Sequence, residues 1–167
     1  PLITSIPEIV FEFMIVITGE TNASGFNVGS EEYSKPGFNI LTSSTLLIVV
    51  ESGNNVIVAG DWNTAHHPID LARPKENINT SGFMPIEREK LDEYVGDGWI
   101  DTFRLFHDEP DRYSWWSYRM GARARNVGWR IDYFFVNSDL TELCKDAEIH
   151  QDVMGSDHCP VSLSLDL

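Results

Sequence analysis

The sequence is short of basic residues, of cysteine and of long apolar runs, and each shortage excludes a class of protein. Its 167 residues hold 12 lysines and arginines against 26 aspartates and glutamates, so the formal net charge of −14 repels polyanions at long range. The two cysteines, Cys144 and Cys159, are too few for a disulfide framework and lack the CxxC spacing of a structural zinc site. The apolar runs at 9–17 and 45–50 are much shorter than the roughly 20 residues that cross a bilayer. No basic segment precedes them as in a signal peptide, so we expect a soluble, intracellular chain without membrane contact.

The basic residues that are present are concentrated in one aromatic stretch. From 112 to 130 the chain has no acidic residue, and its arginines alternate with tyrosine and tryptophan. The arginines are Arg112, Arg119, Arg123, Arg125 and Arg130. This pattern predicts a local surface that binds anions and stacks on planar rings. The alternative is a solvated loop whose aromatic side chains belong to the core.

The apolar pattern predicts several strands and one clear helix, which is typical of a layered α/β fold. Pro85 opens a helix at 86–95, and Gly96 stops it. The connection 64–86 is long and irregular, and such a loop in a compact domain is more often functional than idle. The predicted strands are 9–18, 44–50, 55–63, 112–118, 130–136 and 161–167.

Polar side chains gather where these strands begin or end. Asp61 and Asn63 follow one strand, Asp132 lies in another, and Asp157 and His158 precede the last. Singly, an Asp-x-Asn step is a common turn and an Asp-His pair a common surface couple. Together they offer oxygen ligands for a hard cation such as Mg²⁺ and an imidazole for proton transfer or phosphate contact. The set is typical of metal-assisted phosphodiester hydrolysis.

Five motifs, in order over about two thirds of the chain, give a more specific interpretation. They are GDWNTAHHPIDL (60–71), RPKENINTSGFMPIERE (73–89), DTFR (101–104), YSWWSYRMGARARNVGWRIDYFFV (113–136) and GSDHCPV (155–161). These motifs resemble the C-terminal half of the exonuclease III family of apurinic/apyrimidinic (AP) endonucleases, over residues 56–167. DNase I-like phosphatases share GDxN and SDH, whereas NVGWRIDY and PKENINTSGF resemble the AP endonuclease branch in particular.

The resemblance implies a fold, an activity and a partner. The fold is an α/β sandwich of the DNase I-like type, here lacking much of the N-terminal half. The implied activity is that of a DNA repair phosphodiesterase that uses Mg²⁺, with Mn²⁺ as the alternative ion, as an AP endonuclease and 3′–5′ exodeoxyribonuclease. The implied partner is double-stranded DNA with abasic sites or 3′ ends, and we expect the protein to be a monomer.

The resemblance also assigns catalytic roles by position. Asp61 resembles the acid that activates or orients the attacking water, and Asn63 the amide that holds the water or a phosphate oxygen. His158 resembles the imidazole at the scissile phosphate, with Asp132 behind it to fix its tautomer and charge. Asp157 resembles a carboxylate of the metal site. The implied metal ligands are Asp61, Asn63, Asp157 and His158.

Other positions match the part of the family that contacts DNA. Trp115, Trp129 and Ile131 fall where the family builds an apolar pocket for the base-less sugar. Arg119 falls where the family inserts a side chain into the duplex, and Asn77 lies in a loop that contacts phosphates. For these side chains, a place in the core or in a solvated loop is the alternative.

Residues 1–55 depart from the family and are interpreted as a divergent or remodelled segment of what is a single domain overall. The family's N-terminal half supplies a metal-binding glutamate and a tyrosine near the phosphate, and Glu20 in ITGETN is the nearest counterpart of that glutamate. Two alternatives to a working nuclease therefore stay open. One is an inactive remnant that still binds abasic DNA, and the other is a phosphoesterase of the same superfamily that acts on a phospholipid headgroup or an inositol phosphate.

Overall fold

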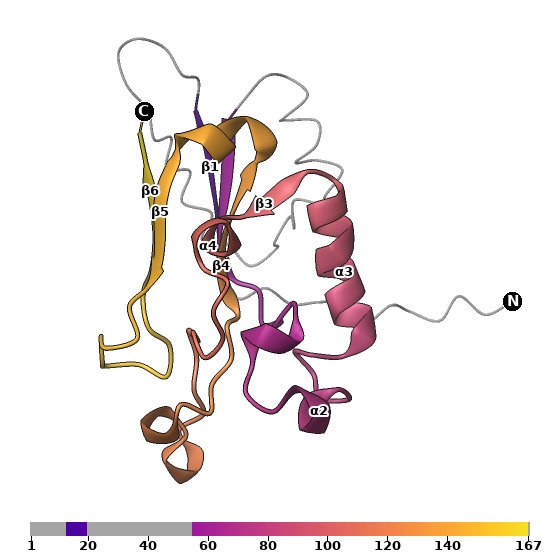
Figure 1. Cartoon of the computed structure of the whole chain (residues 1–167), viewed down its shortest axis with the longest axis vertical. Helices are drawn as coiled ribbons and strands as arrows, with labels where there is room; N and C mark the ends of the chain where they lie inside the picture. The colour runs from indigo at the N-terminus through magenta and orange to yellow at the C-terminus, as the bar shows by residue number, and fades with distance from the viewer. Residues whose placement is uncertain (1–12, 20–54, 167) are drawn as a thin grey trace, which may run out of the picture.

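The computed structural model describes the backbone of residues 13–19 and the whole of residues 55–166 (Figure 1). Its strands are β1 (Phe13–Gly19), β2 (Asn55–Asp61), β3 (Trp99–Asp101), β4 (Asp132–Asn137), β5 (Cys144–Ile149) and β6 (Val161–Leu165). Its α-helices are α2 (Pro74–Asn77), α3 (Pro85–Gly96) and α4 (Thr102–Phe106). Short 3₁₀ turns are Pro68–Asp70, Arg119–Gly121, Arg123–Arg125 and Ser138–Leu143. Within these ranges no helix is long and apolar enough to span a bilayer.

An antiparallel sheet in the order β1-β2-β4-β3 forms the centre of the fold. Along β2 the apolar side chains alternate between its faces: Val56 and Val58 enter one core cluster, and Ile57 enters another. The register of β2 with β4 places Asp61 directly opposite Asp132. Two acidic side chains that are far apart in the sequence thereby reach the same edge of the sheet.

Helix α3 covers one face of this sheet (Figure 1). Pro85 occupies its first turn, where a missing backbone N–H costs nothing. The helix buries Leu91 and Tyr94 against Val56 and Val58, and the Tyr94 ring stacks on Trp99 with the ring centroids 5.0 Å apart. The solvent side of α3 is charged, so the helix is held by one apolar face.

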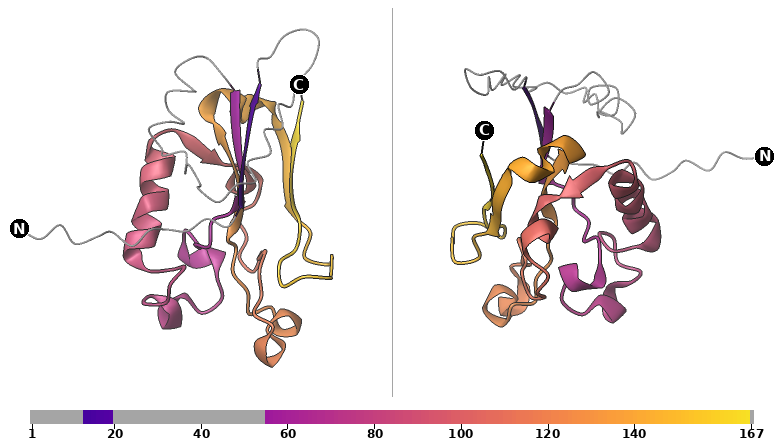
Figure 2. Two further views of the ribbon diagram at one scale, coloured as in Figure 1. Left: turned by 180° about the vertical axis from the view of Figure 1, so that it is seen from behind. Right: turned by 45° about the horizontal axis from the view of Figure 1, so that its top comes forward.

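The pair β5–β6 forms a second, antiparallel sheet on the other face. Ile57 and Val136 of the first sheet pack with Leu140 and Cys144. Figure 2 shows α3 and the β5–β6 pair on opposite sides of the four-stranded sheet. The described residues thus stack as helix, sheet and sheet, the layered α/β arrangement predicted from the sequence.

The structure confirms some predicted elements and corrects others. Strands at 55–61, 132–137 and 161–165 and the helix at 85–96 are present, as is the part of the first predicted strand that is described. The prediction for 44–50 lies outside the described residues. The prediction of a strand at 112–118 is wrong, because Trp115 makes only isolated bridges, to Trp129 and His158.

The sequence did not predict β5 or α4. Strand β5, CKDAEI, exposes the neighbouring Lys145 and Asp146 and has an irregular register next to Cys144, so its apolar residues do not alternate cleanly. Helix α4 has five residues, which is too short for a helical period to stand out.

Candidate active site

Asp61, Asp132 and His158 meet at the edge of the four-stranded sheet. Asp61 ends β2 and Asp132 begins β4, while His158 comes from the segment that leads into β6. The His158 ring has Nδ1 at 3.0 Å from Asp132 Oδ2 and Nε2 at 3.9 Å from Asp61 Oδ2. One nitrogen of the imidazole therefore faces each carboxylate, and all three side chains are partly buried.

A buried serine that the sequence analysis missed holds this arrangement together. Ser114 Oγ accepts hydrogen bonds from the backbone N–H groups of Ile131 and Asp132, each at 3.1 Å. The Ser114 carbonyl accepts the N–H of Cys159 at 2.8 Å. Ser114 thus ties the start of β4 to the residue after His158. Its only sequence signal is a polar residue inside the aromatic run YSWWSY.

The charges around His158 favour the imidazolium. The hydrogen bond with Asp132 raises the pKa of His158 above its usual value, and the Asp132, Asp61 and Asp157 charges add to this, which outweighs the effect of burial. At Asp157, burial raises the pKa, but hydrogen bonds from Trp115 and Ser156 outweigh it and hold the pKa of this carboxyl below its usual range. The site thus combines a stabilised cation at His158 with an ionised carboxylate at Asp157.

The donor atoms at this edge fit a divalent cation. One oxygen each from Asp61 and Asp132 and one nitrogen of His158 all lie within 4.8 Å of one another. Carboxylate oxygens are the ligands that Mg²⁺ and Mn²⁺ take in proteins. The other two predicted ligands are placed differently. Asp157 accepts hydrogen bonds from Trp115 Nε1 at 3.1 Å and from Ser156 Oγ at 3.2 Å, and it is not a member of this group of three.

Asn63 lies at the mouth of the site in a left-handed backbone conformation, with φ of 50°. Its N–H donates to Asp61 Oδ1 at 2.8 Å, so the turn after β2 fixes the carboxylate that it carries. Gly82 packs closely against this turn. Its φ is +93°, and a Cβ at this position would lie 2.9 Å from the carbonyl oxygen of Asn63. Glu20, the nearest counterpart of the family's metal-binding glutamate, lies outside the described residues.

An apolar cluster lies beside the acidic edge. Ile131 is buried, and the partly buried Trp115 and Trp129 pack against it with their rings edge to face, the centroids 6.4 Å apart. Trp115 also donates its indole N–H to Asp157, which joins the apolar cluster to the predicted metal carboxylate. The three residues predicted to line the sugar pocket are therefore brought together next to His158, which Trp115 contacts through an isolated bridge.

Asn77 and Arg119 lie at the ends of separate loops. Asn77 closes α2 and donates its side-chain amide to the carbonyls of Ala72 and Arg73, at 3.3 and 3.0 Å. Arg119 is exposed in a 3₁₀ turn, next to Tyr118 and Met120, which are 77% and 87% exposed. The turn with Arg119 projects from the molecule below the sheets (Figure 1).

The arginine stretch is not one anion-binding surface, which corrects the sequence prediction. Arg130 is fully buried, with Nε at 2.8 Å from Asp70 and both terminal nitrogens paired with Asp101. Arg112 pairs with Glu109 and Glu148. Arg123 donates to backbone carbonyls. Acidic partners neutralise Arg112 and Arg130, and backbone carbonyls occupy Arg123, so only Arg119 and Arg125 of the five are exposed.

The other histidines do not form part of this site. His66 is buried with Nε2 at 2.8 Å from Asp92, and the exposed His67 ring stacks on it with centroids 3.7 Å apart. One donor atom each from His66, His67 and Asp92 lies within 4.8 Å of the others, in a group separate from Asp61, Asp132 and His158. His107 is partly buried, and its Nε2 lies 2.8 Å from the carbonyl oxygen of Ala147. His150 is exposed, with Nε2 at 2.8 Å from Ser162 Oγ.

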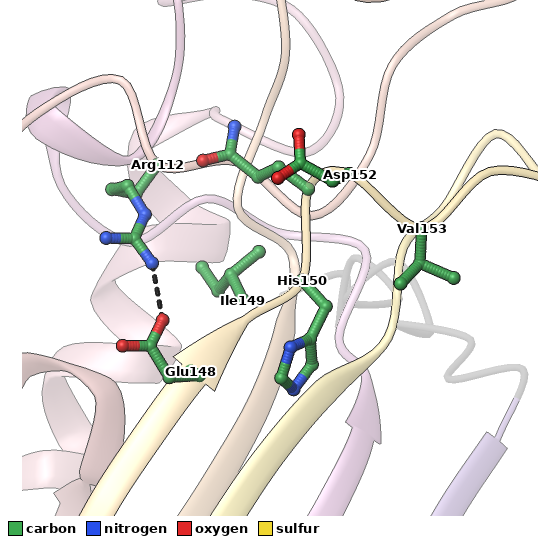
Figure 3. Close-up of a pocket in the computed structure, with 7 residues that line it drawn as sticks. Arg112, Glu148, Ile149, His150, Asp152 and Val153 are labelled. Carbon is green, nitrogen blue, oxygen red and sulfur yellow. Dashed lines mark hydrogen bonds and ion pairs between the residues drawn. The ribbon is translucent and has the colours of Figure 1, made fainter.

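A separate pocket lies at the end of β5 (Figure 3). Its lining includes none of the predicted catalytic, metal or DNA-binding residues, and its arginine, Arg112, is paired with Glu148 at 2.7 Å. The lining residues are Arg112, Glu148, Ile149, His150, Gln151, Asp152 and Val153. With its cation neutralised, this pocket offers no site for an anion.

Comparison with known proteins shows where this arrangement belongs. The profile of the Endonuclease/Exonuclease/phosphatase family matches residues 3–158. The chain belongs to this family. The Bacillus subtilis (strain 168) exodeoxyribonuclease is 44% identical over 158 residues, which are 94% of this chain and 62% of that relative. This member of the family thus spans less than two thirds of the length of that relative.

Solved structures of AP endonucleases share the fold. The enzyme from Leishmania major is 40% identical, with a TM-score of 0.61 over 64% of this chain and 34% of that one. The enzyme from Archaeoglobus fulgidus is 27% identical, with a TM-score of 0.65 over 75% of this chain and 52% of that one. These likenesses confirm the DNase I-like α/β fold and the resemblance to AP endonucleases. The division at residue 55 stays a prediction, although the family match extends to both sides of it.

Proposed function

We propose that this chain carries the hydrolytic centre of an Mg²⁺-dependent DNA repair phosphodiesterase that cuts double-stranded DNA on the 5′ side of an abasic site. The observation that carries the proposal is the arrangement of Asp61, Asp132 and His158, in which each ring nitrogen of His158 faces one carboxylate. The 44% identity to an exodeoxyribonuclease supports the same chemistry, and a 3′-exonuclease activity goes with it.

In the proposed reaction, Asp61 takes a proton from the attacking water. As the water oxygen forms its bond to phosphorus, the bond from phosphorus to the 3′ oxygen breaks, and that oxygen takes a proton from solvent. His158 donates from Nε2 to a phosphate oxygen and offsets the negative charge that grows there. Asp132 accepts from Nδ1 and keeps the ring in this orientation and charged.

Asp61 would hold the metal ion, with His158 beside it. The ion would supply positive charge that stabilises the transition state. Asn63 and Asp157 complete the predicted ligand set: Asn63 would hold the attacking water or a phosphate oxygen, and Asp157 would offer a carboxylate to the metal.

The apolar cluster supplies the proposed specificity. Trp115, Trp129 and Ile131 border the site, and a base-less sugar can enter an apolar slot that an intact nucleotide cannot enter without strain. Arg119, exposed at the tip of its turn, would enter the duplex, and Asn77 would contact a phosphate. A DNA substrate implies an intracellular location, and we expect a monomer.

Incision of a labelled duplex with one abasic-site analogue tests the proposal. We expect cleavage with Mg²⁺, none with EDTA, and a loss of at least about 10³-fold in Asp61→Asn and in His158→Ala. Asp139→Asn, an exposed carboxylate on the Ser138–Leu143 turn, is the matched control and should cleave as the wild type does. Cleavage that persists in both site variants contradicts the proposal.

Two other outcomes correspond to the alternative functions. Preference for the abasic duplex in a gel shift with EDTA, without incision in Mg²⁺, identifies a protein that binds but does not cut. Release of phosphate from an inositol phosphate or phospholipid headgroup, without cleavage of DNA, identifies another phosphoesterase.

A further inference from the structure

Arg123 connects two loops that meet beside the proposed active site. Its guanidinium lies over the ring of the buried Trp116, 4.5 Å from the ring centroid. Nη1 donates to the carbonyl of Ser156 at 2.8 Å, and Nη2 donates to the carbonyls of Gln151 and Val153 at 2.9 and 2.7 Å. One side chain thus holds three carbonyls of the segment 151–156, which we call the 151–156 loop.

This loop leads directly into the catalytic segment. Residues 152–156 are all exposed, and Gly155 has a φ of +130°, so the loop has little packing of its own. Another hydrogen bond across the chain, from Gln151 Nε2 to the carbonyl of Asp111, is long at 3.5 Å. The loop then turns into Asp157 and His158, and Ser156 Oγ accepts the N–H of His158 at 3.2 Å.

The geometry requires an arginine. Two terminal nitrogens of one planar group reach carbonyls in three directions, and the flat face rests on an indole. The indole is itself fixed, because Trp116 Nε1 donates to Asn126 Oδ1 at 3.0 Å. A lysine ammonium at this place reaches fewer of the carbonyls and lacks the flat face.

We propose that Arg123 is a positioning residue: its guanidinium fixes the 151–156 loop on Trp116 and thereby sets the places of Asp157 and His158. The proposal deepens the proposed function and rests on it, because the loop matters for chemistry only if Asp157 and His158 act in the site. Arg123 itself touches no reacting atom. Its guanidinium donates its hydrogen bonds to backbone carbonyls and does not serve to bind DNA.

Hydrogen exchange of the whole chain tests the structural part without any need for activity. In Arg123→Ala we expect the amides of residues 151–159 to exchange at least about tenfold faster, while those of β2 and β4 keep their rates. The Trp115 indole N–H resonance should shift, since its acceptor Asp157 moves. Arg123→Lys should fall between the wild type and Arg123→Ala, and it provides the same test if the alanine variant does not fold.

Arg88→Ala is the matched control. Arg88 also lies over a ring, 4.6 Å from the Phe83 centroid, and also donates to a backbone carbonyl, that of His66, at 2.7 Å. Its removal should lower overall stability without faster exchange at 151–159. Unchanged exchange at 151–159 in both Arg123 variants, or exchange that rises evenly over the molecule, overturns the proposal.

Kinetics on the abasic duplex separate this proposal from the proposed function. We expect Arg123→Ala to lower kcat about tenfold or more with KM within about twofold, and added guanidinium ion to restore part of kcat. A wild-type chain that does not cut, with loosening confined to 151–159 in the variants, contradicts the proposed function alone. A wild-type chain that cuts, with kcat unchanged in both Arg123 variants, overturns the role of Arg123 alone.

Discussion

Asp132 Oδ2 and His158 Nδ1 lie 3.0 Å apart, although 26 positions separate them in the sequence. Asp132 is placed by its register with Asp61 across β2 and β4, and His158 by the backbone contacts of Ser114 and the 151–156 loop. The pair therefore joins the rigid sheet to an exposed loop. Removing either the carboxylate or the supports of the loop should weaken the site in different, measurable ways.

Removing the charge of Asp132 should lower the rate of the reaction. In Asp132→Asn the amide no longer stabilises a charged His158 ring and can present an N–H to Nδ1, which favours the wrong tautomer. We expect kcat on the abasic duplex to fall by at least about tenfold, while circular dichroism shows an unchanged fold. An Asp132→Asn variant with full kcat would show that the pair has no part in catalysis.

Removing the hydroxyl of Ser114 should lower stability. Ser114→Ala leaves the backbone N–H groups of Ile131 and Asp132 without the acceptor Oγ in a fully buried position. We expect the free energy of unfolding in urea to fall by about 1–3 kcal/mol. Ser164→Ala, on the exposed side of β6, is the matched control, and an equal loss there would count against this account.

The buried ion pairs of Asp70 should make stability fall in acid. Burial alone raises the pKa of Asp70, but the charges and hydrogen bonds of Arg130 and Arg104 outweigh it and bring the pKa to about 2, below the ordinary 3.8. The pKa of Asp70 is lower in the folded protein than in the unfolded chain, so its ionised carboxylate stabilises the fold. This contribution to the free energy of unfolding, on the order of 2 kcal/mol, is present above pH 4 and is lost as the pH falls toward 2.

Urea unfolding of the wild type and of Asp70→Asn between pH 6 and pH 2 measures this contribution. The variant leaves Arg130 buried with one partner fewer, so it should be less stable at pH 6. Its stability should also fall less steeply below pH 4. Parallel curves for the two proteins over that range would show that the Asp70 pKa is not lowered by folding.

Truncation of Trp129 should remove selectivity for the abasic site. Trp129 packs edge to face on Trp115, and its ring also lies against Gly82. In a gel shift with EDTA, we expect Trp129→Ala to lose about tenfold of its preference for abasic over intact duplex, and Trp129→Phe to keep most of it. Equal loss of binding to both duplexes would place Trp129 in the core of the fold and not in a DNA pocket.

Much of the acidic site was predictable because it depends on local sequence. One buried strand ends at Asp61, and another begins at Asp132. When two such strands pair in antiparallel orientation, the end of one lies beside the start of the other, so the two carboxylates become neighbours. The motif around His158 adds the imidazole. The resemblance to a family then supplied roles that spacing alone leaves open.

The supports of the site were not predictable in this way. Arg130 and Arg123 both belong to the stretch predicted to bind anions, but their partners lie 28 to 60 positions away in the sequence. These partners are Asp70 and Asp101 for Arg130 and the loop carbonyls for Arg123. Ser114 is a single hydroxyl in an aromatic run. Such contacts depend on the folded arrangement, and no periodicity or composition marks them.

Mapping the cut in a duplex with one abasic-site analogue tests the central claim most directly. The account predicts Mg²⁺-dependent incision on the 5′ side of the analogue, leaving a 3′-hydroxyl. It also predicts at least about 10²-fold less cutting when an intact nucleotide replaces the analogue. Equal cutting of both duplexes, or no incision by the folded wild-type chain, would contradict it.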